Sequence, residues 1–185
     1  MSRFALLLLI LATNRAAAEV IRFKDMPYEA LNSLLHLDLS RGADWKASGF
    51  YSINESGALD GPFDARYEVK GHDDELNADY HFKQDVYGSF QAGTEIGVWR
   101  YEFVYDDGID YFQDHTITIT HNAKSCSQST FDGRIGYLMP QTRHVFTKPA
   151  LCTPDAVLNE AHVLWKLEYE NQRKNGDSNH NAPAE

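Results

Sequence analysis

Cysteine is scarce in this chain of 185 residues, which contains only Cys126 and Cys152. Neither has a second cysteine or a histidine at the spacing of a zinc site. In an oxidising compartment, two cysteines most simply form one disulfide. In the chain-entropy model, closing the loop between these cysteines stabilises the folded state by about 3.5 kcal/mol. A free reactive thiol and a pair of metal thiolates are the alternatives.

Long apolar runs are also lacking, apart from Phe4 to Ala12 near the start. One early positive charge, about ten apolar residues and the small residues Ala16 to Ala18 are typical of a secretory signal peptide, whereas a membrane span needs roughly twice that apolar length. We therefore expect residues 1–18 to be cleaved, leaving a secreted or periplasmic protein without membrane insertion. No cysteine follows the small residues, so no lipid anchor is expected. An apolar helix kept in the fold is the alternative.

Basic residues are few, with 17 Lys and Arg against 27 Asp and Glu and a formal net charge of −10. Such a surface repels phosphate backbones and anionic lipid, which argues against nucleic acid as a partner. A protein partner, and a basic one in particular, is compatible with this charge. The simpler interpretation is that acidity keeps a secreted protein soluble. The sequence does not indicate an oligomeric state.

Common catalytic motifs are missing as well. The chain has no Gly-x-Ser-x-Gly, and its Gly93 to Gly97 turn lacks the lysine and the following helix of a phosphate loop. A carboxylate pair for glycoside hydrolysis depends on the fold rather than on sequence spacing, so it stays open. We predict no catalytic residue and no cofactor.

Metal ligands show no convincing spacing either. His115 and His121 share a predicted strand face but lie about 20 Å apart along it, and His81 would have to approach from another strand. The acidic turn at Asp106, Asp107, Asp110 and Asp114 lacks the distal glutamate of a calcium loop. Turn formation and solvation explain these residues, so no metal site is predicted.

The most strongly patterned stretch runs from Gly93 to Gly108 and contains an aromatic strand between two glycine turns. Side chains alternate along a strand, so one face carries Trp99, Tyr101, Phe103 and Tyr105, and Arg100 and Glu102 point the other way. The aromatic face is expected in the core. If it were left uncovered, it would form a contact surface for a protein or a glycan. The turn at 106–108 predicts a hairpin with 111–121.

Similar alternation predicts further strands at 50–53, 63–69, 76–82 and 86–91, then a polar loop at 122–130 and a last strand pair between 133 and 146. Helical spacing predicts one helix over 26–37 and another after the Thr153 cap and Pro154, ending at Asn175–Gly176. The predicted fold is mainly β (α+β), an antiparallel meander of hairpins with an N-terminal and a C-terminal helix packed on the sheet. Residues 19–173 are expected to form one domain and 174–185 a disordered tail.

An internal repeat relates two of these turn-strand units. Gly57, Gly61, Phe63 and Tyr67 align with Gly93, Gly97, Trp99 and Phe103 at an offset of 36 positions. Glycine permits a positive φ in each turn, and the aromatic side chains share one sheet face.

In this respect the chain, over about 49–108, resembles the MORN-type (membrane occupation and recognition nexus) repeat, in its divergent bacterial antitoxin-like variety. That resemblance implies β-hairpin units stacked into an elongated sheet that serves as a scaffold or binding surface without catalytic residues. The units here recur at a longer interval than in that family, and 71–90 matches its pattern poorly.

The resulting hypothesis is a secreted or periplasmic, non-catalytic binding or scaffold protein of the inhibitor or immunity type. A small envelope hydrolase or a small-ligand carrier is the alternative. A deep cleft with converging Asp, Glu and His side chains would favour an enzyme, whereas a continuous sheet with one bare face would favour a scaffold.

Overall fold

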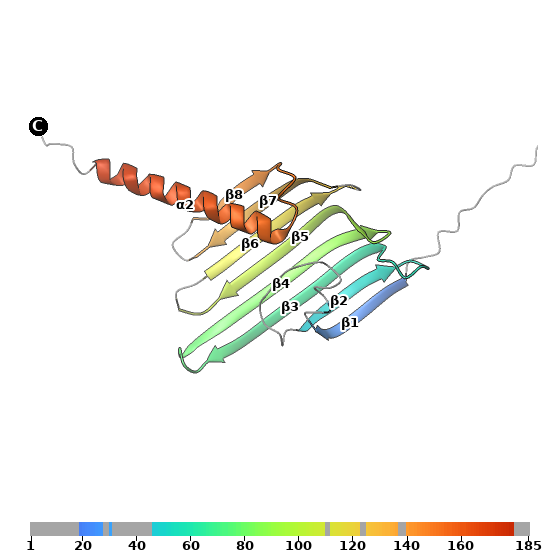
Figure 1. Cartoon of the computed structure of the whole chain (residues 1–185). Helices are drawn as coiled ribbons and strands as arrows, with labels where there is room; N and C mark the ends of the chain where they lie inside the picture. Colours follow the sequence, from blue (N-terminus) through green and yellow to red (C-terminus); the bar gives the residue numbers. More distant parts are fainter. Residues whose placement is uncertain are drawn as a thin grey trace, which may run out of the picture.

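In the residues that the structure describes, the protein forms one eight-stranded antiparallel sheet with one long helix on one face (Figure 1). The computed structural model describes residues 19–27, 30, 46–109, 112–122, 125–136 and 140–179, with only the backbone described for 172–179. Each strand pairs with the next in chain order, which makes the sheet a meander. The elements are β1 (Glu19–Pro27), β2 (Lys46–Ile53), β3 (Gly61–Asp73), β4 (Ala78–Gln91), β5 (Thr94–Asp106), β6 (Phe112–His121), β7 (Cys126–Ile135), β8 (Thr142–Phe146) and α2 (Pro154–Asn179).

The alternating sequence of the central strands produces one apolar and one polar face, as antiparallel sheets commonly have. Across the strands the register aligns the apolar positions, so that Val86 lies opposite Tyr101 and Tyr101 opposite Ile117, which in turn faces Phe131. We call this side the apolar face. The opposite side, on which Arg66 faces Asp85, is the polar face. The predicted antiparallel, mainly β architecture is confirmed.

Aromatic side chains form the centre of the apolar face. The indole of Trp99 has no exposed surface and packs against Phe63 and Phe90, with ring centroids 5.7 and 4.9 Å away. Its Nε1 donates a hydrogen bond to the carbonyl of Ser89 at 3.2 Å. Gly88 lies directly beneath the indole, at an irregularity in the β4–β5 register, and a Cβ there would collide with the ring. The glycine therefore makes room for the largest core side chain.

Helix α2 begins as the sequence predicts. Thr153 caps it, with the Ala156 amide donating to Thr153 Oγ1 at 3.3 Å, and Pro154 occupies the first position. Val157 and Ala161 join the buried cluster of the apolar face, where the helix contacts β6 and β7. The helix continues past Asn175–Gly176, where the sequence predicts its end, and in Figure 1 its C-terminal part projects beyond the sheet. Residues 180–185 of the predicted tail lie outside the described residues.

Several predicted boundaries are wrong. The start of the N-terminal helix expected over 26–37 is wrong, because Met26 and Pro27 belong to β1. Ala30 is helical, and the remainder of the expected helix lies outside the described residues. The strands expected at 76–82 and 86–91 are one continuous strand, β4. Leu76, expected on the buried face, is 59% exposed because it lies in the β3–β4 turn, where Asp73 Oδ1 accepts its amide hydrogen. The polar segment expected as a loop at 122–130 contains the first half of β7.

Candidate functional site

The polar face is hollowed over strands β5 to β8, and this hollow has a volume of about 660 Å³. We call it the polar hollow. Its floor and walls consist of strand residues, among them Gly133 of β7, together with the Pro140–Gln141 segment before β8. The strand side chains that line it are the arginines Arg100, Arg134 and Arg143, the threonines Thr116, Thr118 and Thr130, and the aspartates Asp114 and Asp132.

The strand register arranges these side chains in three rows across the sheet. In the first row Arg100 lies opposite Thr118, which lies opposite Thr130. The second row joins Thr116, Asp132 and Arg143, and the third joins Asp114 and Arg134. Because neighbouring strands are about 4.8 Å apart and same-face residues along one strand about 6.8 Å, Asp132 lies between Arg134 and Arg143, and the threonines lie on the side of Arg100.

The three guanidinium groups are held in different ways. Arg100 Nε pairs with Glu102 Oε1 at 2.7 Å. Arg134 lies over the ring of Phe112, with its Cζ 4.4 Å from the ring centroid, a cation–π arrangement that fixes the plane of the guanidinium. Arg143 is 71% exposed and only approaches Asp132, at 4.0 Å from Nε to Oδ2. A second contact to Asp132 comes from Gln141, whose Nε2 donates to Oδ1 at 3.2 Å.

A separate ion cluster lies on the same face over β3 and β4. The Asp85 carboxylate is buried, with Arg66 Nε 2.7 Å from Oδ1 and Lys83 Nζ 2.6 Å from Oδ2. Burial opposes ionisation of this carboxyl, but the hydrogen bonds from Arg66 and Lys83 outweigh it and lower its pKa below the ordinary value. Asp85 is therefore an ionised structural anchor rather than a proton donor.

The residues predicted as a contact surface lie on the apolar face. Trp99 and Tyr101 are buried in the core, and Phe103 and Tyr105 are half-buried and pack against that cluster. Trp99 and Tyr101 therefore offer no accessible surface. The opposite side of this strand, where Arg100 contributes to the polar hollow, is the accessible one.

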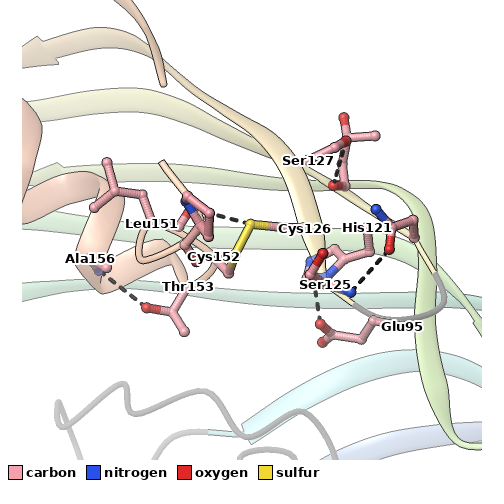
Figure 2. The surroundings of a disulfide bond; sticks show 12 residues. Glu95, His121, Ser125, Cys126, Ser127, Leu151, Cys152, Thr153 and Ala156 are labelled. Carbon is pink, nitrogen blue, oxygen red and sulfur yellow. Dashed lines mark hydrogen bonds and ion pairs between the residues drawn. A yellow bond between two sulfur atoms is a disulfide. The ribbon is translucent and has the colours of Figure 1, made fainter. Parts of the chain in front are cut away.

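The predicted disulfide between Cys126 and Cys152 is confirmed (Figure 2). The two Cα atoms are 5.6 Å apart, within the usual range for a disulfide. Cys126 begins β7, and Cys152 precedes the Thr153 cap of α2, so the bond ties the sheet to the start of the helix. The free-thiol and metal-thiolate alternatives are thereby excluded. A disulfide is compatible with an extracellular or periplasmic location; residues 1–18 of the predicted signal peptide lie outside the described residues.

The histidines are distributed over both faces. His81 lies on the polar face beside Glu68, with Nε2 3.1 Å from Oε1, and does not join His115 or His121 in a metal site. His121 Nε2 lies 3.3 Å from Glu95 Oε2 near the disulfide (Figure 2), and burial lowers its pKa. Within the described residues, no group of three or more His, Cys, Asp or Glu side chains could hold a metal ion.

His115 is a core residue. Its ring stacks between Phe103 and Phe131, at centroid distances of 5.0 and 5.3 Å, and Gly133 faces it from β7. Its Nδ1 has no hydrogen-bond partner among the described residues. Burial lowers the pKa of His115 to about 4, and His162 of α2 acts in the same direction. The imidazole is therefore neutral at neutral pH and packs as an aromatic ring.

The acidic turn after β5 is explained by local hydrogen bonds. Asp106 Oδ1 accepts the amide hydrogen of Gly108 at 2.9 Å, and Asp107 Oδ1 accepts that of Ile109 at 3.0 Å. Asp110 lies outside the described residues. The predicted role of these carboxylates in turn formation therefore holds for Asp106 and Asp107.

The repeated glycines have positive φ values, as the sequence predicts; Gly57 and Gly93 lie in turns, whereas Gly61 begins β3 and Gly97 lies within β5. The φ values are 79° at Gly57, 111° at Gly61, 81° at Gly93 and 68° at Gly97. The 36-position offset thus relates β3 to β5, with β4 between them, and places Phe63 in direct stacking contact with Trp99. The repeat is a pair of similar strand entries in one sheet.

Comparison of the chain with protein-family models, with curated proteins and with solved structures finds no match. No helix in the described part of the chain has the length and apolar character needed to cross a membrane. Functional argument therefore rests on the geometry of this sheet.

Sequence reasoning did not find the polar hollow, because its residues come from four strands. One local signal was present: Thr116, Thr118 and Thr120 alternate with Ile117 and Ile119 in β6, which gives that strand a hydroxyl face. The arginines that line the hollow with the threonines carry no such signal, since the strand register alone brings them together.

Proposed function

We propose that this protein is a secreted or periplasmic, non-catalytic binding protein that recognises its partner through the polar face of the sheet. The observation that carries the proposal is a continuous polar face that no described helix packs on, hollowed over β5 to β8. The apolar face cannot serve this role where α2 covers β6 and β7 and where Trp99 and Tyr101 are buried. A partner or ligand of the envelope, as for inhibitors and immunity proteins, is the class proposed.

The distribution of ionisable groups supports binding over catalysis. Acid–base chemistry needs titratable groups with shifted pKa values that converge on one cleft. Here the carboxyls with lowered pKa values, Asp85 and Glu68, pair with basic side chains outside the polar hollow. The imidazoles with lowered pKa values, His115 and His121, also lie outside the hollow. The hollow itself contains arginine, threonine and aspartate side chains, which suit recognition through hydrogen bonds.

A small-ligand carrier is the second candidate function, because the volume of the polar hollow lies within the range of small-molecule sites, about 300–1,000 Å³. The two candidates share one recognition surface and differ in what occupies it. A hydrolase would instead require Asp114 and Asp132 to act as a catalytic pair on the same face.

Affinity capture from envelope extract tests the proposal, using residues 19–185 as bait. The combined variant Arg100→Ala, Arg134→Ala and Arg143→Ala should lose the captured partner, because it removes the guanidinium groups of the hollow. A control variant with Val163→Ser and Leu167→Ser on exposed positions of α2 should retain it. Loss in the α2 variant with retention in the arginine variant would contradict recognition through the polar face.

A further inference from the structure

We propose that the polar hollow binds a carboxylate-bearing sugar, such as a uronic acid unit of an oligosaccharide. This inference rests on the proposed function and names the ligand of the same site. It follows from three features of the hollow: the positions of its guanidinium groups, the hydroxyl groups that lie beside them, and the negative charges that repel a dense polyanion.

The arginines provide the contact to the carboxylate. Arg134 is fixed by the Phe112 ring at 4.4 Å, and within the described residues it makes no ion pair. A guanidinium held by its flat face still presents its N–H groups at its edge, where they match the two oxygens of a carboxylate. Arg143, 71% exposed and 4.0 Å from Asp132, is adjustable and can close on the ligand from β8.

The threonines provide matched partners for sugar hydroxyl groups. Thr118 and Thr130 lie directly opposite each other, with Thr116 in the next row, and none of the three hydroxyls has a hydrogen-bond partner among the described residues. A hydroxyl group both donates and accepts, which is also what a sugar hydroxyl does. The carboxylates of Asp114 and Asp132 add acceptors within the hollow.

Charge argues against a dense polyanion. The chain carries a formal net charge of −10, and two aspartates lie within the hollow itself. Phosphate groups or long sulfated chains would meet repulsion both at long range and on contact. A ligand with one carboxylate per sugar ring and several hydroxyls satisfies the arginines without crowding negative charge against the aspartates.

Location argues against an extended peptide. The hollow lies on the face of the sheet, and β5, β6 and β7 are each paired on both sides, so a peptide backbone could add as a new strand only along the outer edge of β8 and not within the hollow. A peptide could contact the hollow only with its side chains. A hydroxyl-rich ring, by contrast, can use the hydroxyl, carboxylate and guanidinium groups together.

Isothermal titration of residues 19–185 with trigalacturonic acid tests the inference. The carboxyl-reduced trisaccharide, glucose 6-phosphate and an acetylated tri-glutamate peptide are the comparison probes. We expect the uronic acid to bind at least about tenfold more tightly than the carboxyl-reduced trisaccharide, since one bidentate guanidinium–carboxylate contact of about 1.4 kcal/mol corresponds to that factor. It should also bind more tightly than the peptide, which lacks sugar hydroxyls for the threonines, and than the phosphate, which concentrates more negative charge near the aspartates.

Variants locate the site. Arg134→Ala should weaken binding of trigalacturonic acid about tenfold, and Thr118→Val, which keeps a β-branched side chain, should weaken it several-fold. Lys70→Ala removes one positive charge from the same face outside the hollow and should leave the affinity unchanged. If Lys70→Ala weakened binding as much as Arg134→Ala, the loss of affinity would follow from net charge alone, and the assignment of the site to the polar hollow would be wrong.

The comparison probes decide the ligand class. If the peptide or the phosphate bound more tightly than trigalacturonic acid, the sugar assignment would be wrong in favour of that ligand. If the carboxyl-reduced sugar bound as tightly as trigalacturonic acid, the proposed contact between the arginines and the carboxylate would be wrong. If none of the four probes binds, the inference fails. The proposed function fails separately, if the triple arginine variant retains the partner captured from the extract.

Discussion

The two faces of the sheet use the same strands for opposite purposes. On the apolar face of β5, Trp99 has no exposed surface and packs against two aromatic rings, so its environment is dry and closely packed. One residue further along, Arg100 on the polar face is half exposed and lines a hollow. Alternation alone produces this contrast. Stability should therefore depend on the first face, and recognition on the second.

Removing the central aromatic side chain is the strongest way to test this comparison. Trp99→Ala should lower the free energy of unfolding by about 4 kcal/mol, because it removes a large buried ring and leaves a cavity. Urea denaturation with the disulfide intact measures the change. The neighbouring Val98→Ala, at a position 60% exposed, should cost no more than about 0.5 kcal/mol. Similar losses for both variants would contradict the division into a structural and a surface face.

The disulfide ties α2 to the sheet on the apolar face, so removing it tests the contribution of that face to stability. The double variant Cys126→Ala with Cys152→Ala should lower the free energy of unfolding by about 3.5 kcal/mol, since the bond closes a loop between residues 26 positions apart. Thermal and urea unfolding measure the loss, and the wild-type protein should yield no free thiol. A titre of two thiols per chain in the oxidised protein would contradict the bond.

The sequence predicted the apolar face better than the polar one for a physical reason. Burial of Trp99 and Tyr101 follows from period-two alternation, which is local, and the caps and turns at Thr153 and Asp106 are equally local. The start of β7 was missed because Cys126 to Thr130 is polar, and only pairing with β6 makes it a strand. Which polar side chains meet is also set by register, a non-local property.

The same limit applied to the candidate site. Thr118 and Thr130 are separated by a hairpin, and Arg100 joins them from the preceding strand. No sequence spacing indicates that these three form one row. The predicted contact residues therefore came from the face with the strong local pattern, and that face carries the core.

Acidification should act mainly through the apolar face. His115 has a folded-state pKa of about 4, below the ordinary value of 6.5, so the unfolded chain takes up the proton first. The free energy of unfolding should therefore fall as pH drops below about 6.5, and the loss should level off below about 4, at about 3 kcal/mol for this residue. His121, whose pKa burial also lowers, acts in the same direction.

His115→Phe tests the assignment, because a phenyl ring fits the stack between Phe103 and Phe131 and takes up no proton. Urea denaturation between pH 7.5 and 4.5 should show a flatter pH dependence in this variant. His72→Asn, which changes an exposed histidine on the polar face, should keep the wild-type slope. An unchanged slope in His115→Phe would show that His115 is accessible to protons in the folded state.

The smallest expected stability effect concerns the one buried carboxylate of the described polar face. Asp85→Asn leaves Arg66 and Lys83 without their shared anion, but both cations reach solvent, at 59% and 30% side-chain exposure. The cost should therefore be about 1–2 kcal/mol, below that of breaking a fully buried pair. Because the pKa of Asp85 is lowered, this contribution is present above the ordinary carboxyl pKa and is lost as pH falls through the folded-state value.

Glu68→Gln is the matched control, since Glu68 also contacts two basic side chains, Lys70 and His81, but is itself exposed. Its cost at pH 7, measured by urea denaturation, should be clearly smaller than that of Asp85→Asn, because solvent screens the exposed Glu68 pairs. An equal loss of stability in the two variants would contradict the prediction that the buried carboxylate of Asp85 contributes more to the free energy of unfolding than the exposed carboxylate of Glu68.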